Sequence, residues 1–317
     1  MNEVIIGVDL GGTQMRVGVF NRDLHLLDRL AEPTRAHEGQ ESVIGRLLDL
    51  IERAIPTGGD SIVLGIGVSA PGPINPRTGT IISPPNLPGW RRVALRQIVE
   101  DRLGYTTHLG NDANVAALAE ATRGAAHGYK YVIYLTVSTG IGSGIIDDGH
   151  LVIGSNGLGA EAGHTILVVN GRISTLEKEA AGPAIASKAV AQIKAGKPSR
   201  IRDLVNGDLS QVTAKTVGQA AAEGDSLAQE LIRQAGFMVG LGIVSLMHLF
   251  NPQIIVVGGG VSKTGDLLFE PMREAVRQYT IDPAYCENVP IVPAALGDNV
   301  ALIGAAALVA THGGSRL

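Results

Sequence analysis

Three glycine-rich turns have the residue types that bind phosphate groups and nucleotides. The turns are DLGGT at 9–13, STGIGSG at 138–144 and GGG at 258–260, and each follows an apolar run. Bare glycines allow backbone N–H groups to approach an anion closely, and hydroxyl side chains add further donors. The first two turns suit a polyphosphate and the third suits the nucleoside end of the same ligand. The predicted binding residues are Gly11, Gly12, Thr13, Ser138, Thr139, Gly140, Gly142, Gly258, Gly259 and Gly260.

The first turn fits neither of two common phosphate-binding motifs. A Walker loop needs Lys followed by Ser or Thr after its last glycine, and a dinucleotide fingerprint needs three spaced glycines that open a helix. After Gly12 the chain alternates instead, with Met15, Val17 and Val19 on one side, which predicts a β-hairpin. Each turn alone could be an ordinary tight turn. Three turns at equivalent strand ends favour a nucleotide site.

The elements that must position these turns occur twice in one order. Apolar runs and amphipathic periods predict strands at 4–9, 15–20, 25–31, 62–68 and 105–109, and helices at 40–55, 93–103 and 111–123. The second set comprises strands at 131–138, 143–147, near 151, 254–258 and 290–294, and helices at 175–195, 226–250, 266–279 and 299–311. This order predicts a duplicated α/β fold with a mixed sheet in each half. A cleft between two such halves is a common place for a small ligand.

Composition excludes several other classes of protein. The 317 residues carry a net charge of −4 without a basic run, so we expect no nucleic-acid partner. A single cysteine, Cys286, excludes an intrachain disulfide framework and fits the reducing cytosol. We see no signal peptide and expect a cytoplasmic protein with no membrane partner. The most apolar stretch, 236–260, is interrupted by Asn251-Pro252 and ends in three glycines, which favours a buried helix followed by a buried strand.

Seven segments together resemble the ROK family of bacterial sugar kinases, which lies within the actin-like ATPase superfamily. They are DLGGTQMR at 9–16, SAPGPINPRTG at 69–79, SPPNLPGW at 83–90, GNDAN at 110–114, STGIGSG at 138–144, GAEAGH at 159–164 and VVGGGVS at 256–262. The segment SPPNLPGW and the residues after it are most similar to the glucokinase branch. The resemblance implies a duplicated actin-like (ribonuclease H-like) fold. We expect a smaller domain, 1–111 plus about 299–317, to which the last helix returns, and a larger domain, 112–298.

The resemblance also implies roles for individual residues. The first two turns would bind the phosphates of ATP, the third would lie at the adenosine, and Asp9 would help to position Mg²⁺ through water. Asn111 and Asp112 match the sugar-binding and catalytic pair. The residues implied in sugar binding are Asn86, Asn111, Asp112, Glu161, His164 and Glu177.

Asp112 follows a short predicted strand and opens a predicted helix. A carboxylate there could accept the proton of the attacking sugar hydroxyl. Asn and Asp are also preferred helix N-caps, but Asn111 can cap the helix while Asp112 acts in catalysis. Arg16 could add charge at the phosphates or could end on the outer face of the hairpin, so the predicted site does not include it.

The sequence departs from the family between His164 and Glu177. Many members have three cysteines in this segment that bind zinc together with the histidine, whereas this segment has none. A structural zinc ion needs four ligands, so we expect no zinc. We expect packing by Ile166, Leu167, Val168 and Leu176 to hold the segment instead.

The predicted function is transfer of the γ-phosphoryl group of ATP to the 6-hydroxyl of a hexose, with glucose first. Mannose, fructose or an N-acetylated amino sugar is the alternative within this class. The family also contains sugar-responsive repressors, which carry a helix-turn-helix domain ahead of the first motif; that motif begins at residue 9 here, so we expect none. An actin-like or chaperone-like ATPase would lack GNDAN and GAEAGH. A non-catalytic sugar-binding regulator is disfavoured by the presence of Asp112. The family suggests a homodimer.

Overall fold

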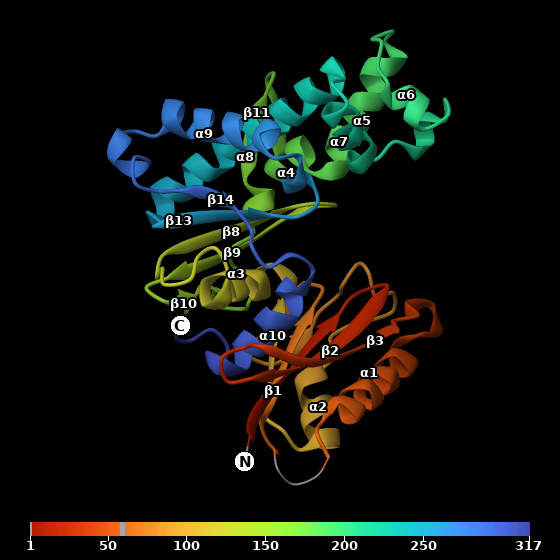
Figure 1. Cartoon of the computed structure of the whole chain (residues 1–317), viewed down its shortest axis with the longest axis vertical. Coiled ribbons are helices and arrows are strands. Elements are labelled where there is room, and N and C mark those ends of the chain that lie inside the picture. The colour runs from red at the N-terminus through yellow and green to blue at the C-terminus, as the bar shows by residue number, and fades with distance from the viewer. Residues whose placement is uncertain (1, 58–60) are drawn as a thin grey trace. The chain divides into compact units, whose positions relative to one another are not determined.

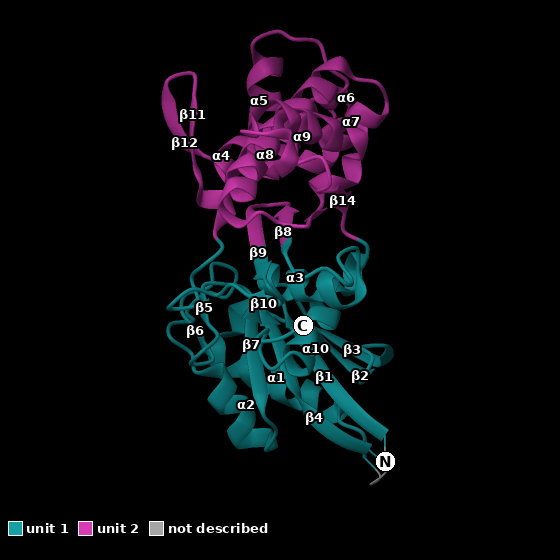
Figure 2. Ribbon diagram, turned by 90° about the vertical axis from the view of Figure 1, so that its left-hand side faces the viewer, with its two compact units in different colours: residues 1–132, 144–160, 295–317 teal, residues 133–143, 161–294 magenta. Residues whose placement is uncertain are grey.

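The computed structural model describes residues 2–57 and 61–317, which form two compact units (Figure 2). Unit 1 comprises 1–132, 144–160 and 295–317, and unit 2 comprises 133–143 and 161–294. This grouping follows contacts within the chain and does not test the predicted domains, 1–111 with 299–317 and 112–298. Those bounds therefore stay a prediction.

The first sheet has five strands in the order β3-β2-β1-β4-β7. Its strands are β1 (Asn2–Leu10), β2 (Gln14–Asn21), β3 (Leu26–Pro33), β4 (Ser61–Ala70) and β7 (Thr107–Asn111). Antiparallel pairing joins β1 to β2 and β2 to β3, while β4 pairs in parallel with both β1 and β7. The sheet is therefore mixed, and the carboxyl ends of β1, β4 and β7 meet at one edge.

The second sheet repeats this arrangement in the order β10-β9-β8-β13-β14. Its strands are β8 (Val132–Val137), β9 (Ile141–Asp147), β10 (His150–Leu151), β13 (Ile254–Gly258) and β14 (Ile291–Pro293). Strand for strand, the order along the chain is the same as in the first sheet. The predicted duplicated α/β fold with a mixed sheet in each half is confirmed.

The helices of unit 1 pack on the first sheet (Figure 1). They are α1 (Gln40–Ala54), α2 (Leu95–Leu103), α3 (Asp112–Arg123) and α10 (Val300–Ala310). Alternate residues of β1 share one buried cluster with α1 and α2. On β1 and β4, Gly7 and Gly67 let the backbone of α10 lie against the sheet. The Ala- and Gly-rich last helix thus packs closely against the first sheet.

Gly67→Ala is expected to destabilise unit 1 strongly. A Cβ atom at Gly67 would lie 1.7 Å from the carbonyl oxygen of Ala305, so α10 would have to move away from the sheet. Overpacking of this kind costs about 1–3 kcal/mol or more in the free energy of unfolding. Gly45→Ala is the matched control, because a Cβ atom at that exposed position in α1 would meet nothing within 4 Å. It should stabilise the protein by up to about 1 kcal/mol. Denaturant unfolding of both variants checks the contrast, which equal midpoints would contradict.

Unit 2 is richer in helices than the sequence predicts. Its helices are α4 (Leu176–Ala180), α5 (Gly182–Lys194), α6 (Ile201–Leu204), α7 (Ala214–Ala222), α8 (Ser226–Phe250) and α9 (Asp266–Tyr279). The single helix predicted at 175–195 is wrong, because Ala181 is extended and α5 begins anew with Pro183 in its first turn. The helix α8 is long and apolar enough to cross a membrane, but 61% of its apolar window is buried. The mostly buried helix α8, followed by the buried strand β13, confirms the prediction of a buried helix and a buried strand over 236–260.

The remaining elements are short. Two hairpins are formed by β5 (Ile74–Asn75) with β6 (Thr80–Ile81) and by β11 (Ile166–Val169) with β12 (Arg172–Thr175). Figure 2 shows the β11–β12 hairpin projecting from the rest of unit 2 beside α4. Single-turn 3₁₀ helices occupy Ala36–Glu38, Ala162–His164, Leu209–Gln211, Val261–Thr264, Pro283–Tyr285 and Gly297–Asn299.

Candidate functional site

The DLGGT turn is the tip of the β1–β2 hairpin, as predicted. The carbonyl of Gly11 accepts the hydroxyl of Thr34 at 2.6 Å, and the carbonyl of Thr13 accepts the N–H of Thr34 at 2.8 Å. These bonds use carbonyls of the turn and leave the N–H groups of Gly12 and Thr13 without a protein acceptor among the described residues. The tip therefore presents two backbone donors that suit an anion.

Asn86 lies directly beside this tip. A Cβ atom added at Gly12 would come within 2.9 Å of the Cβ atom of Asn86. The backbone approach therefore requires glycine at this position. A predicted phosphate-binding residue and a predicted sugar-binding residue are thus neighbours within unit 1.

Asp9 is held from one side by Arg16. The two residues face each other across the hairpin, and Nε and one terminal nitrogen of Arg16 donate to Oδ2 of Asp9 at 2.9 and 2.6 Å. The other terminal nitrogen of Arg16 donates to the carbonyl of Asp298 at 2.8 Å. Burial raises the pKa of Asp9, and the hydrogen bonds and charge of Arg16 offset this only in part. Oδ1 of Asp9 accepts no hydrogen bond from the described residues, so it is available to a ligand.

Asn111 caps α3 as predicted, while the catalytic role of Asp112 stays a prediction. Oδ1 of Asn111 accepts the N–H of Asn114 at 2.8 Å and so caps the helix. Oδ1 of Asp112 accepts the N–H of Ala113 at 2.8 Å, while its other carboxylate oxygen accepts no hydrogen bond from the described residues. Solvent reaches the exposed Asp112 side chain, and a carboxylate oxygen remains free to accept a proton.

The surroundings of Asp112 favour its protonated form. Partial desolvation by surrounding protein atoms raises the pKa of Asp112, and the negative charge of Asp9 raises it further. The hydrogen bond from Ala113 offsets only part of this effect. A carboxyl group with a raised pKa is a better proton acceptor once it is ionised, which suits a general base.

The sheet places these residues at one edge. Asp9 of β1 is level with Ser69 of β4, which is level with Gly110 of β7, one residue before Asn111. Ser69 is fully buried, and its hydroxyl has no hydrogen-bond partner among the described residues. In the sequence, Ser69 stands out only as part of a motif. Its position between Asp9 and Asn111 follows from the parallel pairing of β4 with β1 and β7, which the sequence does not specify.

Arg16 is the other residue that sequence reasoning left out of the site. The hairpin signal already placed residues 9 and 16 opposite each other, because the turn is centred on Gly12 and Thr13. In the structure the guanidinium of Arg16 faces Asp9 rather than ending on the outer face of the hairpin, so Arg16 lies at the predicted site.

The STGIGSG turn of unit 2 is tied to Glu177. The N–H of Ile141 donates to Oε2 of Glu177 at 2.9 Å, and a Cβ atom at Gly140 would come within 2.6 Å of the same oxygen. The carbonyl of Ser138 accepts the N–H of Gly182 at the start of α5. The carboxylate of Glu177, a predicted sugar ligand, is thus hydrogen-bonded to a predicted phosphate-binding turn.

The third turn adjoins the second within unit 2. Gly259 has a φ of +91°, and a Cβ atom there would lie 2.3 Å from the carbonyl oxygen of Val137. A Cβ atom at Gly260 would lie 3.9 Å from the hydroxyl of Ser138. Only glycine fits position 259, because both its backbone angle and the close strand exclude a side chain.

The GAEAGH segment also packs on β9. The N–H of Ala162 donates to the hydroxyl of Ser143 at 3.0 Å, and a Cβ atom at Gly163 would lie only 2.0 Å from the carbonyl oxygen of Ile141. Glu161 and His164, at the two ends of this turn, are exposed. The close approach at Gly163 therefore leaves both polar side chains open to a ligand.

Four apolar residues were expected to hold the segment between His164 and Glu177 by packing, in place of a metal ion. This expectation is wrong for two of them. Ile166 and Val168 lie on the β11–β12 hairpin with exposed fractions of 61% and 72%. Leu176 is fully buried and lies against Gly242 of α8. Among residues 2–57 and 61–317, no group of three or more His, Cys, Asp or Glu side chains could hold a metal ion. The absence of zinc stays a prediction.

The structure therefore assembles the predicted residues into two groups, one in each unit. Unit 1 holds Asp9, the first turn, Asn86, Asn111 and Asp112. Unit 2 holds the second and third turns with Glu161, His164 and Glu177. The group in unit 1 combines backbone donors for an anion with polar side chains that suit sugar hydroxyls, and the group in unit 2 adds two glycine turns and three further polar side chains.

Comparison with known families shows to which family a chain with these two groups of residues belongs. The model of the ROK family matches residues 5–312. The chain belongs to the ROK family. This ROK protein is 33% identical over 310 residues to a glucokinase of Thermotoga maritima, covering 96% of both chains. It is 31% identical to a glucokinase of Halalkalibacterium halodurans, covering 96% of this chain and 94% of the relative. A xylose repressor of Caldicellulosiruptor bescii is also 31% identical, but this chain covers 77% of it.

Solved structures of ROK proteins have the same fold. The ROK hexokinase from Thermus thermophilus is 35% identical with a TM-score of 0.79, covering 96% of this chain and 97% of that one. A ROK family glucokinase from Streptomyces griseus, in complex with glucose and AMPPNP, is 31% identical with a TM-score of 0.78, covering 96% and 98%. These likenesses confirm the actin-like ATPase fold inferred from the sequence.

Proposed function

We propose that this ROK protein is an ATP-dependent glucokinase that transfers the γ-phosphoryl group to the 6-hydroxyl of glucose. The observation that carries the proposal is whole-length similarity to glucokinases, one of which was solved with glucose and an ATP analogue. The free carboxylate oxygen of Asp112 at the start of α3 supports a catalytic rather than a purely binding role.

Each predicted residue has a proposed role in this reaction. Asp112 accepts the proton of the attacking hydroxyl, which strengthens the nucleophile as the new bond forms. The three glycine turns hold ATP through backbone donors. The remaining polar side chains bind the sugar hydroxyls: Asn86, Asn111, Glu161, His164 and Glu177.

Asp9 fits a role beside Mg²⁺. The ion usually keeps several waters and contacts few protein carboxylates, and when bound it neutralises charge on the phosphates. One oxygen of Asp9 is fixed by Arg16 and the other is free, so the carboxylate is oriented and can still accept a hydrogen bond from a water.

We further propose that the protein is cytoplasmic, since its single cysteine fits the reducing cytosol. The family suggests a homodimer, which light scattering of the purified protein checks.

The xylose repressor among the relatives supports a second candidate, a sugar-binding regulator without catalysis. Both candidates would bind a sugar. Only the kinase would consume ATP in proportion to the sugar converted, so turnover distinguishes them.

A panel of sugars tests the proposal. With Mg²⁺ and ATP, glucose is expected to give the highest kcat/KM, ahead of mannose, fructose and N-acetylglucosamine. NMR should identify the product as glucose 6-phosphate, and 6-deoxyglucose, which lacks the attacking hydroxyl, should give no product. A higher kcat/KM for another sugar would change the assigned substrate. ADP release without a phosphorylated sugar would contradict the kinase assignment.

A further inference from the structure

Glu179 is a buried carboxylate with no part in the proposed reaction. It lies on α4, and its side chain is only 2% exposed. Oε1 of Glu179 accepts the hydroxyl of Ser174 at 2.6 Å and a terminal nitrogen of Arg172 at 2.7 Å. Oε2 accepts Nζ of Lys188 at 3.0 Å, and the same Nζ donates to the backbone carbonyl of Glu179 at 2.8 Å. We call these four residues the Glu179 clasp.

The Glu179 clasp joins three separate elements around one charge. Arg172 and Ser174 come from β12, Glu179 from α4 and Lys188 from α5. Burial acts to raise the pKa of Glu179, but the three donors outweigh burial and lower the pKa to about 2. The carboxylate is therefore ionised at any pH at which the protein would work. A buried ionised carboxylate binds its donors more strongly than a neutral acceptor would.

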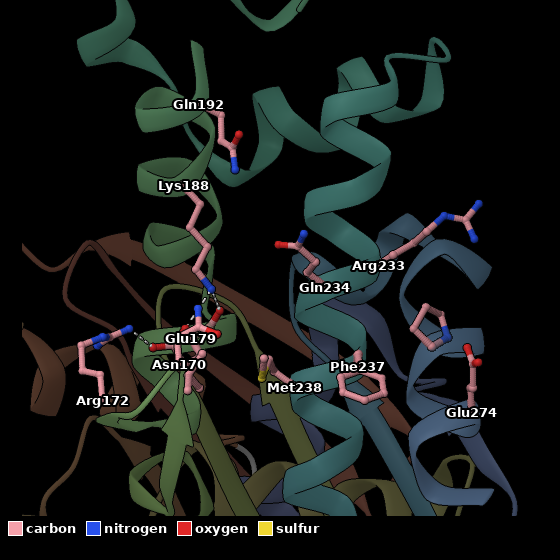
Figure 3. A pocket seen from close by; sticks show the side chains of 12 residues that line it. Asn170, Arg172, Glu179, Lys188, Gln192, Arg233, Gln234, Phe237, Met238 and Glu274 are labelled. Carbon is pink, nitrogen blue, oxygen red and sulfur yellow. Dashed lines mark hydrogen bonds and ion pairs between the residues drawn. The ribbon is translucent and has the colours of Figure 1, made fainter. Parts of the chain in front are cut away.

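The surroundings show how the hairpin is connected here. A cavity of about 680 Å³ lies beside the clasp, bordered by the β11–β12 hairpin, α5, α8 and α9 (Figure 3). In Figure 3, Lys188 reaches toward Glu179 from one side and Arg172 from the other, while Phe237 and Met238 of α8 stand apart from them. At this position residues of the hairpin and of α8 border the cavity, and the bonds that the structure shows for Arg172 and Ser174 here are the polar ones to Glu179.

The clasp is two residues from a predicted sugar ligand. Glu177 and Glu179 share α4, a helix of five residues that is too short to be stable by itself. Oε2 of Glu177 accepts the N–H of Ile141 in the second glycine turn. Any displacement of α4 would therefore move the Glu177 carboxylate relative to that turn.

We propose that the Glu179 clasp is a positioning device that fixes α4 and so holds the carboxylate of Glu177 against the second glycine turn. The effect on sugar binding rests on the proposed function, in which Glu177 contacts the sugar. The effect on the Ile141–Glu177 hydrogen bond does not. A shift of about 1 Å in a binding group can reduce catalysis on the order of 10²-fold.

Lys188→Met and Glu179→Gln test the positioning role. Lys178→Met is the matched control, because Lys178 is an exposed lysine on the same helix whose side chain makes no hydrogen bond or ion pair with the described residues. Both clasp variants should raise the KM for glucose on the order of tenfold and the KM for ATP by a smaller factor, because the second glycine turn also loses its bond to Glu177. The control should change neither constant, and Lys188→Arg, which keeps the charge, should approach the wild type. Unchanged glucose KM values, or equal increases in both KM values, would overturn the proposal.

Hydrogen exchange at the amide of Ile141 gives a readout independent of activity. In the clasp variants this amide should exchange on the order of tenfold faster, while exchange in the core of β8 stays unchanged. Unchanged exchange at Ile141 would also overturn the proposal. If the wild-type protein phosphorylates no sugar but Ile141 responds as expected, the proposed function fails and the positioning role stands.

Discussion

Asp112→Asn is expected to lose about 10²–10⁴-fold in kcat, the usual contribution of a general base. Asparagine keeps the size and shape of the side chain but cannot take the proton of the attacking hydroxyl. Asn111 will still cap α3, because its own carbonyl oxygen holds the N–H of Asn114. The variant should therefore fold normally and still bind glucose.

Two measurements separate catalysis from binding in this variant. Steady-state kinetics give the loss in kcat, and calorimetric titration with glucose should show a dissociation constant close to that of the wild type. Asp101→Asn, at an exposed carboxylate on α2, is the control for removal of one negative charge and should keep full activity. An Asp112→Asn enzyme that retained more than about a tenth of the wild-type turnover would exclude Asp112 as the base.

The raised pKa of Asp112 predicts how rate and stability depend on pH. The base must be ionised to act, so the wild-type rate should fall as the pH falls through a pKa above the ordinary value of 3.8. The free energy of unfolding depends on pH in the opposite direction to the rate, because a fold that raises the pKa of an acid is more stable when that acid is protonated. Ionisation of Asp112 therefore costs stability as the pH rises, and Asp112→Asn should be slightly more stable than the wild type at neutral pH.

The sequence predicts the order of elements along the chain and the local pairs well, because both depend on patterns and contacts near in the chain. The hairpin centred on Gly12 is predicted by alternation and by the glycine pair, and its register places Arg16 opposite Asp9. The cap by Asn111 is predicted by residue preference at helix starts. What sequence alone could not supply were partners remote in the chain, such as the carbonyl of Asp298, to which Arg16 also donates.

Two of the apolar residues between His164 and Glu177 do not pack as predicted, for a physical reason. Apolar residues at 166–168 suggest packing, but a two-stranded hairpin has no second layer unless another element covers it. The turn itself was visible, because Asn170-Gly171 is a strong hairpin signal and both residues have positive φ, 51° and 74°. The burial of Glu179 was not visible, since it depends on Lys188, which lies on a different helix.

Asp9→Asn is expected to have the second largest effect, a loss on the order of 10²-fold in kcat, because charge stabilisation of the phosphates would be impaired. The structure gives the reason, since Arg16 fixes one carboxylate oxygen and leaves the other for a ligand. Asparagine would leave Arg16 without its countercharge and would remove the negative charge that a hydrated cation needs. The concentration of Mg²⁺ for half-maximal rate should therefore rise by about 10–100-fold.

Arg16→Met separates the charge of Asp9 from its orientation. This variant keeps the carboxylate but releases it from the clamp, so Oδ2 loses both of its hydrogen bonds. Its requirement for Mg²⁺ should lie between those of the wild type and Asp9→Asn, and glucose affinity, measured without nucleotide, should stay unchanged in both variants. If Asp9→Asn kept the wild-type dependence on Mg²⁺, the carboxylate would have no role toward the cation. If Arg16→Met instead matched Asp9→Asn, orientation by Arg16 would account for the whole effect, because a mobile carboxylate would then be no better than an uncharged amide.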